Sequence, residues 1–360
     1  MRSKLSLRMA ALLIAVLVVV VAALTLSAEA QERPPIRIQR PPVQLPREIL
    51  VRAAGPTVAF ETRIDPNLLQ RASGLNVYRL EPPRFDRSVF GALGERLFEG
   101  QLRGQQVQLE GLMAMSSADN PSDFLLLDTQ SGLLSFSRGM ADQIDDRRGE
   151  LPGEEQAASI ARNFLMQMGL GPRDEKQMVL AHVGRIRSRS FDPQTGNEGP
   201  VLDQMLTVYF GRQVDDLMVV GGGSKMIVQI GDGGRGVGAG VRWRELGAAT
   251  RVDAKNLRSA EQLMQDIRTF MGTEQRQAQR VAITRAALFY YDNGGNFLQP
   301  ILGYQARIRA GEFEYNYFGQ TALLVNPPEL VGPEPLSRQA VETLQKGAED
   351  LQAPTRIPTD

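Results

Sequence analysis

The sequence predicts an α+β protein in which amphipathic helices cover antiparallel sheets. Short segments of alternating apolar residues dominate the chain after residue 56, two helices of similar pattern lie far apart, and several strand-like segments follow each of them. The 35 Gly and 21 Pro residues favour many turns over long helices. A fold of tandem units, each with a helix on an antiparallel sheet, satisfies all three observations.

The first 30 residues have the pattern of an export signal. A basic head, Arg2, Lys4 and Arg8, precedes an uncharged apolar run over residues 9–26, and the pattern Ala28-x-Ala30 provides a cleavage site. An uncleaved membrane anchor is the alternative, because an 18-residue helix spans about 27 Å, close to the hydrocarbon core of roughly 30 Å. In either case we expect the remaining chain to be extracytoplasmic, either periplasmic or secreted.

Proline-rich segments flank the predicted folded region. Residues 31–55 hold five prolines, which favour extended polyproline II and oppose both helix and central strand, so this segment is predicted to be a stiff spacer. Residues 327–360 are again rich in proline, and we expect a frayed tail with one short helix.

The first folded segment, residues 56–150, is predicted to be an irregular α+β unit. Strand-like alternation at 57–64 and 74–81 precedes a short helix at about 86–98. Residues 123–139 then have the pattern of a hairpin, with its turn at Thr129–Gly132.

The second unit is predicted over residues 151–250. Pro152 suits the first turn of a helix, and five apolar residues follow at helical spacing: Ala157, Ala161, Phe164, Leu165 and Met168. Strands are predicted at 177–190, 204–212, 224–232 and 237–246.

The third unit, residues 251–326, repeats this order. A helix is expected from Asn256 to Met271, with an apolar stripe made of Ala260, Leu263, Met264, Ile267 and Phe270. Three strands are predicted after it, at 280–292, 297–310 and 314–325. Each helix would cover one face of its sheet and leave the other face for a partner or a neighbouring unit.

Ten residues of the second unit carry a family pattern: Tyr209, Gly211, Val214, Val219, Val220, Gly221, Ile227, Val228, Ile230 and Gly233. With these residues the unit resembles the PepSY and protease-propeptide (FTP) type of exported domain. The resemblance spans residues 150–246 and extends more loosely over 250–326. It implies a cystatin-like fold and a role as an inhibitor, an intramolecular chaperone or a sensory module, without catalytic residues. Three consecutive glycines, 221–223, depart from the family pattern.

The composition excludes several kinds of binding and catalysis. With 41 basic and 41 acidic side chains the chain lacks the basic field that nucleic acid binding needs, and without cysteine it has no thiolate chemistry. The single histidine, His182, is predicted to be structural. The glycines at 221–223 and 233–240 are interpreted as turn residues, because strands rather than helices follow them. No catalytic residue, metal or cofactor is predicted.

Aromatic residues beside arginines suggest a contact surface instead. We predict that Tyr209, Arg212, Trp243 and Arg244 bind another extracytoplasmic protein or peptide through an exposed sheet face or edge. Two alternatives stay open. One is a hydrolase or lyase of the cell envelope that uses carboxylates from distant strands, although the doublets 145–146 and 215–216 are better explained as turns. The other is a structural envelope protein held by the uncleaved N-terminal helix.

Overall fold

The computed structural model describes residues 59–60, 64–98, 106–109, 111–117, 120, 122–144, 149–274, 280–332, 336 and 340–345. The predicted export segment, the spacer, the doublet at 145–146 and much of the predicted tail lie outside the described residues. Within the described part of the chain, no helix is long and apolar enough to cross a bilayer. The elements discussed below belong to the compact unit formed by residues 57–360.

The structure is a mixed α+β fold, built on a large sheet to which 15 strands of the described residues contribute. The main helices are α3 (Pro66–Ala72), α4 (Arg87–Phe98), α5 (Glu154–Gln167) and α6 (Ala260–Glu274). The strands are β1 (Ala59–Phe60), β2 (Asn76–Leu80), β3 (Gln106–Leu109), β4 (Leu112–Ser116), β5 (Phe124–Asp128), β6 (Leu133–Ser137), β7 (Met178–Phe191), β8 (Glu198–Val214), β9 (Leu217–Val220), β10 (Lys225–Ile230), β11 (Gly236–Arg242), β12 (Leu246–Arg251), β13 (Arg280–Tyr291), β14 (Phe297–Ala310) and β15 (Phe313–Ala322).

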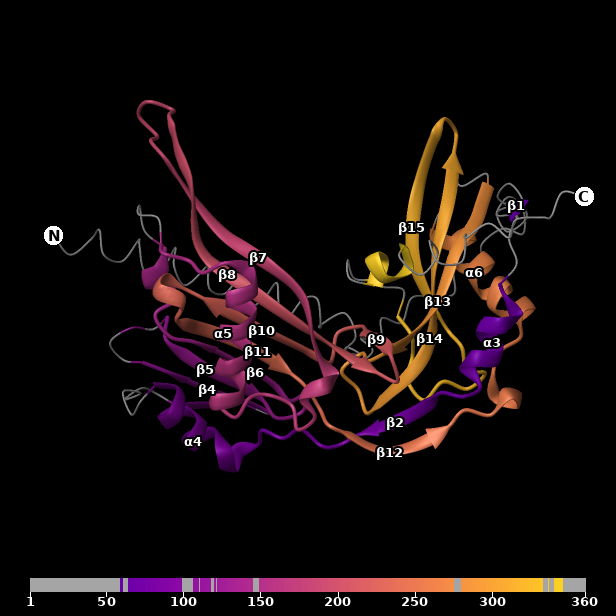
Figure 1. The fold of residues 1–360 in the computed structure, drawn as a ribbon, viewed down its shortest axis with the longest axis horizontal. Coiled ribbons are helices and arrows are strands. Elements are labelled where there is room, and N and C mark those ends of the chain that lie inside the picture. Colours follow the sequence, from indigo (N-terminus) through magenta and orange to yellow (C-terminus); the bar gives the residue numbers. More distant parts are fainter. Residues whose placement is uncertain are drawn as a thin grey trace, which may run out of the picture. The chain divides into compact units, whose positions relative to one another are not determined.

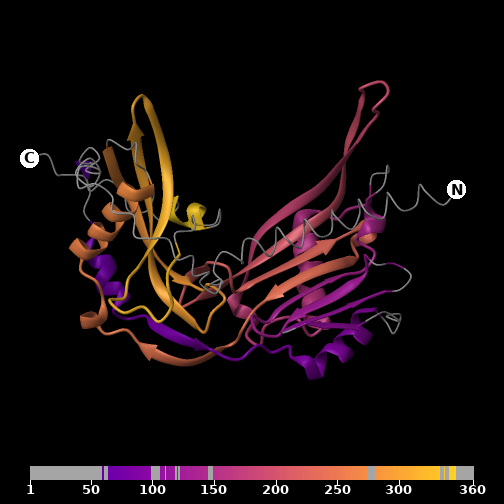
Figure 2. The ribbon, with the colours of Figure 1, turned by 180° about the vertical axis from the view of Figure 1, so that it is seen from behind.

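Helix α5 covers one face of an antiparallel array that runs β7-β8-β10-β11-β6-β5-β4-β3. Figure 1 shows the helix in front of these strands, and Figure 2 shows it behind them. Its fully buried Ala157 and Ala161 let the helix backbone approach the sheet closely, and alternate β8 residues such as Val208 and Phe210 meet it in the same core. The predicted apolar stripe is therefore confirmed at Ala157, Ala161 and Leu165, which are all buried.

Helices α3 and α6 lie against a second array, in which β13 pairs with β14 and β14 pairs with β15 (Figure 1). Leu263, Met264 and Ile267 of α6 enter a core with β13 and β14. The helix begins later than predicted, at Ala260. The reason is a capping box, in which the Ser259 hydroxyl accepts from the Gln262 N–H and the Gln262 side chain accepts from the Ser259 N–H.

The two arrays are joined by strands that cross between them. β9 pairs with β8 in antiparallel fashion and with β13 in parallel fashion, while β2 pairs with both β12 and β14. Buried residues of α4, β5, β6, α5, β8, β10 and β11 share one hydrophobic core, whereas Ile64 and Ala72 belong to the core of α6. The expected divide at residue 150 therefore does not coincide with a gap between cores, because β6 extends the sheet of β11.

The predicted hairpin at 123–139 is confirmed as β5 and β6, with Gly132 at a φ of 72° in its turn. The predicted strand at 237–246 is wrong in its second half. β11 ends at Arg242, residues 243–245 leave the sheet, and β12 then pairs with the distant β2. The expected alternation of side chains through Arg242, Trp243 and Arg244 therefore does not occur.

Candidate functional site

Three of the four predicted contact residues are buried. Arg212 is 0% exposed, Trp243 is 5% exposed and Arg244 is 9% exposed, whereas Tyr209 is 38% exposed. The prediction that Arg212, Trp243 and Arg244 form an exposed contact surface is therefore wrong. Their aromatic and guanidinium groups do lie together, but they face the interior.

Arg212 uses its guanidinium to join three segments. Nε and Nη2 donate to Gln177 Oε1 at 2.8 and 2.6 Å, and Nη1 donates to the carbonyl oxygen of Arg244 at 2.8 Å and to Ser224 Oγ at 3.3 Å. A planar fork with several fixed donors can satisfy such a divergent set of acceptors, which a lysine ammonium cannot.

Trp243 lies beneath the same guanidinium. The Cζ atom of Arg212 is 4.6 Å from the centroid of the Trp243 ring, a cation–π arrangement. Burial lowers the pKa of Arg212 to about 10, and the negative charges of Asp292 and Glu245 oppose that shift. Arg212 thus keeps its positive charge at neutral pH despite its burial.

Arg244 donates hydrogen bonds to backbone carbonyl groups near the ends of β2 and β14. Its Nε donates to the Glu81 carbonyl oxygen at 2.7 Å, and its Nη1 donates to the Gly295 carbonyl oxygen at 2.6 Å. Longer bonds of 3.3 to 3.4 Å reach the Leu80 carbonyl oxygen and Asn296 Oδ1. Burial also lowers the pKa of Arg244. This side chain therefore ties the end of β11 to the segments around β2 and β14.

The glycine loop before β10 wraps around a buried aspartate. Ser224 Oγ donates to Asp292 Oδ2 at 2.6 Å, and the Gly294 N–H donates to Asp292 Oδ1 at 2.8 Å. A Cβ atom added at Gly223 would lie 2.2 Å from the Asp292 carboxyl group, and Gly221 adopts a φ of 103° beside the backbone of the same residue. Only glycine permits this approach at 221 and 223, whereas a Cβ at Gly222 would meet nothing closer than 3.6 Å. We call Arg212, Ser224, Arg244 and Asp292 the buried junction.

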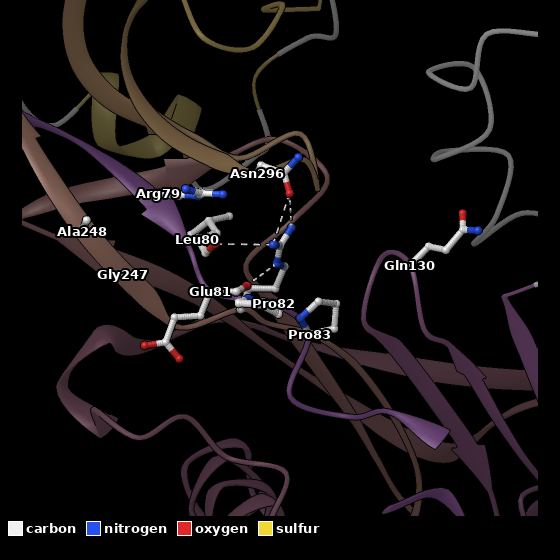
Figure 3. A pocket seen from close by; sticks show the side chains of 10 residues that line it. Arg79, Leu80, Glu81, Pro82, Pro83, Gln130, Gly247, Ala248 and Asn296 are labelled. Atoms are coloured by element: carbon white, nitrogen blue, oxygen red, sulfur yellow. Dashed lines mark hydrogen bonds between the residues drawn. The ribbon is translucent and has the colours of Figure 1, made fainter. Parts of the chain in front are cut away.

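A pocket of about 440 Å³ adjoins the buried junction at Arg244. Figure 3 shows Gln130, from the β5–β6 turn, across the pocket from Arg79 of β2, and dashed bonds that reach Leu80, Glu81 and Asn296. The five N–H hydrogens of the Arg244 guanidinium are directed at protein acceptors. This side chain therefore stabilises the fold. Of the described residues that line the pocket, Glu81 is the one carboxylate, and it pairs with Arg173 at 2.8 Å.

Tyr209 and His182 lie next to each other on the sheet face opposite α5. They are partners across β7 and β8, and their rings stack with centroids 6.0 Å apart. A structural role for His182 stays a prediction. Among the described residues, no group of three or more His, Cys, Asp or Glu side chains is placed to hold a metal ion.

β7 is an edge strand whose bulges and charged side chains oppose the addition of a further strand. In the described residues it pairs with β8 alone, and its register shifts at three places. Arg185 and Arg187 both bind Asp203 of β8, and Arg189 binds Glu198. Bulges and charged side chains are devices that prevent a further strand from adding to an edge.

β15 is an edge strand without register shifts. It pairs with β14 in ten consecutive register positions with no bulge, from Ile301↔Ala322 to Ala310↔Phe313. Among the described strands, β14 is the one that pairs with it. Its distal half is exposed, and Phe313 is 77% exposed. Figures 1 and 2 show the β14–β15 hairpin extending beyond α6.

Hydrogen bonding identifies which β15 residues present backbone groups to the outside. The Leu336 N–H donates to the Phe318 carbonyl oxygen at 3.3 Å, so the backbone of Phe318 is directed away from β14. Because backbone groups alternate along a strand, Asn316 and Glu314 direct theirs to the same free side. The outward backbone groups of residues 314 and 316 are therefore not used by any described strand. The sequence signal for it was the alternation of aromatic residues at 313, 315 and 317.

No family model matches the chain, and no curated protein matches it. Among solved structures, the chain is similar to an uncharacterized protein from Eubacterium rectale ATCC 33656, with 7% sequence identity and a TM-score of 0.40. The similarity covers 72% of this chain and 86% of that protein.

Proposed function

We propose that this chain is an extracytoplasmic, non-enzymatic binding module that captures an extended segment of another exported protein by strand addition to β15. Main-chain hydrogen bonds to Glu314 and Asn316 would hold the added strand, and no titrating side chain is needed. The observation that carries the proposal is the bulge-free register of β15, which pairs with β14 alone among the described strands.

Three features favour β15 over the β7 edge. Its aromatic residues offer apolar area to the neighbouring side chains of an added strand. Its Phe318 carbonyl oxygen already accepts a backbone N–H from outside the sheet. β7, by contrast, carries three register shifts against β8.

We further propose that the helix-on-sheet units are cystatin-like and that residues 150–246 are of the PepSY type. The order of α5 followed by β7, β8, β10 and β11, and of α6 followed by β13, β14 and β15, supports this. An experimental PepSY-domain structure superposed on residues 150–246 should follow the same helix-then-sheet path. A different strand order would contradict the assignment.

The first residue of the purified protein tests the predicted export. We expect the product purified from the periplasm or the medium to begin at Gln31, because the Ala28-x-Ala30 pattern directs cleavage there. Retention of the N-terminal apolar segment would favour the membrane-anchored alternative. A product found in the cytoplasm would contradict the proposal.

Binding is tested with peptides on the exported product of the full chain. A panel of labelled seven-residue peptides with alternating valines is titrated with the protein, and binding is followed by fluorescence anisotropy. Asn316→Pro removes the outward N–H and should reduce binding at least tenfold, since proline is tolerated on an outward edge position but cannot donate. Asn316→Ala, which keeps the N–H, should bind peptides whose intervening residues are alanine like wild type.

Hydrogen exchange gives a second measurement that does not depend on a variant. The amide hydrogens of Glu314 and Asn316 should exchange more slowly when peptide is bound, while those of exposed β7 residues should not change. If no peptide binds, or if Asn316→Pro binds as well as wild type while retaining its circular dichroism spectrum, strand addition at β15 is wrong.

A further inference from the structure

We propose that the segment captured at β15 carries an acidic residue between two apolar residues, with the acidic side chain opposite Asn316. This inference rests on the proposed function and specifies its partner. It comes from the two different faces that β15 would present to an added strand.

One face of the β15 edge is aromatic. Phe313, Tyr315 and Tyr317 share it, because side chains alternate along a strand. Tyr317 is anchored by Phe270 of α6, with ring centroids 5.9 Å apart, and by Tyr304 of β14 at 6.4 Å. Tyr315 and Phe313 continue this row beyond the helix and are 40% and 77% exposed. An added strand would gain most by placing apolar side chains on this face.

The opposite face of the same hairpin is basic. Arg307 lies across from Asn316, and Arg309 lies across from Glu314. Arg280 of β13 in turn lies across from Arg309, and all three arginines are exposed. Glu314 is the acidic member of this face, and it pairs with Arg307 at 3.4 Å between Oε1 and Nε. Among the described residues on this side of the hairpin, Arg307 and Arg309 outnumber Glu314, which leaves an excess of positive charge without counting Arg280.

The neighbours of each outward-facing β15 residue determine which position of the added strand suits an acidic side chain. A carboxylate opposite Glu314 would lie beside a like charge, which is unfavourable for directly opposed residues. The position opposite Phe318 is next to the bond that Leu336 already makes. The position opposite Asn316 adjoins an amide side chain, with the long side chain of Arg307 on the strand behind. A carboxylate there would meet a hydrogen-bond donor and a net positive field.

The experiment compares three peptides that share one alternating valine framework and differ in the intervening residue: glutamate, glutamine or lysine. With the exported full chain, the glutamate peptide should bind about tenfold more tightly than the glutamine peptide, and the lysine peptide most weakly. Because exposed charges are screened, raising the salt to about 1 M should shrink these differences.

Charge reversal provides the matched test. Arg307→Glu should reverse the order, so that the lysine peptide binds more tightly than the glutamate peptide. Arg187→Glu on the β7–β8 ribbon changes the net charge equally and should leave the order unchanged. This control separates a local effect from the overall charge of the protein.

The outcomes distinguish this inference from the proposed function. Equal binding of the three peptides, or an order that Arg307→Glu does not change, would overturn the acidic preference while strand addition at β15 still holds. Absence of binding by all three peptides, together with unchanged exchange at Glu314 and Asn316, would overturn both.

Discussion

At the scale of single residues, burial changes the role of the predicted contact residues. Arg212 was expected to reach a partner, but its donors are satisfied by Gln177, Ser224 and the backbone of Arg244. A charged group removed from water must find acceptors within the fold, and here three segments supply them. Arg212 therefore acts as a structural centre of the first array.

We predict that Arg212→Met lowers the free energy of unfolding by about 3–5 kcal/mol, because it leaves buried acceptors without a donor. Urea unfolding followed by circular dichroism measures this. The control is Arg187→Met, which removes an exposed ion pair with Asp203 and should cost less than about 1 kcal/mol. Similar losses for both variants would contradict the role given to Arg212.

A second prediction concerns buried tyrosines. Burial raises the pKa of Tyr290, and the hydrogen bond that its hydroxyl donates to Asp215 adds to this; burial also raises the pKa of Tyr304. The folded state thus holds these protons more tightly than the unfolded state. Their contribution to stability is complete below pH 10 and is lost as the pH rises above it.

Stability measured by urea unfolding should accordingly fall with increasing pH above about 10, the usual pKa of tyrosine. The double variant Tyr290→Phe, Tyr304→Phe should show a shallower decline in that range, since phenylalanine has no proton to lose. An unchanged slope in this variant would show that other groups govern alkaline unfolding.

At the scale of elements, loops and hairpins depend on a few glycines. The loop 221–223 closes on Asp292, and the β14–β15 hairpin turns at Gly311, which has a φ of 62° in a two-residue connection. Positive φ at the first position of such a turn is the arrangement expected of a type II′ hairpin. These glycines position the buried junction and the free edge of β15.

We predict that Gly221→Ala lowers stability by about 1–3 kcal/mol, because its Cβ would meet the carbonyl oxygen of Asp292 at 2.3 Å in a strained backbone conformation. Thermal unfolding measures the loss. The matched control is Gly240→Ala in β11, where a Cβ would meet nothing within 4 Å; it should be neutral or slightly stabilising. Equal effects at the two glycines would contradict the close approach at Asp292.

At the scale of the whole described unit, the buried junction couples two hydrophobic cores. Arg244 follows β11 of the first array and bonds to carbonyl groups that flank β2 and β14 of the second. β9 and β12 add strand pairings between the same regions. We therefore expect wild type to unfold in one cooperative transition.

Arg244→Ala should separate this transition into two. Trp243 is the sole tryptophan of the sequence and lies in the first core, so its fluorescence reports that core, while far-UV circular dichroism reports all elements. The two signals should coincide in wild type and diverge in the variant. Coincident transitions in the variant would show that the strand pairings alone couple the cores.

Much of the fold follows from local patterns. Helical spacing identified the stripes of α5 and α6, and period-two alternation with turn residues identified the hairpin at 123–139 and the long strands after each helix. These features are determined within a few residues along the chain, because each element must hide one face. The exclusion of cysteine chemistry likewise needs only the composition.

The candidate site required the tertiary structure. Arg212 and Asn316 both belong to predicted strands, yet Arg212 is buried in a core and Asn316 is exposed on a strand whose one described partner is β14. Burial and edge position depend on which strands pair across the chain, such as β2 with β12 and β9 with β13. Those pairings are selected by the summed packing of distant segments, which periodicity within any one of them does not encode.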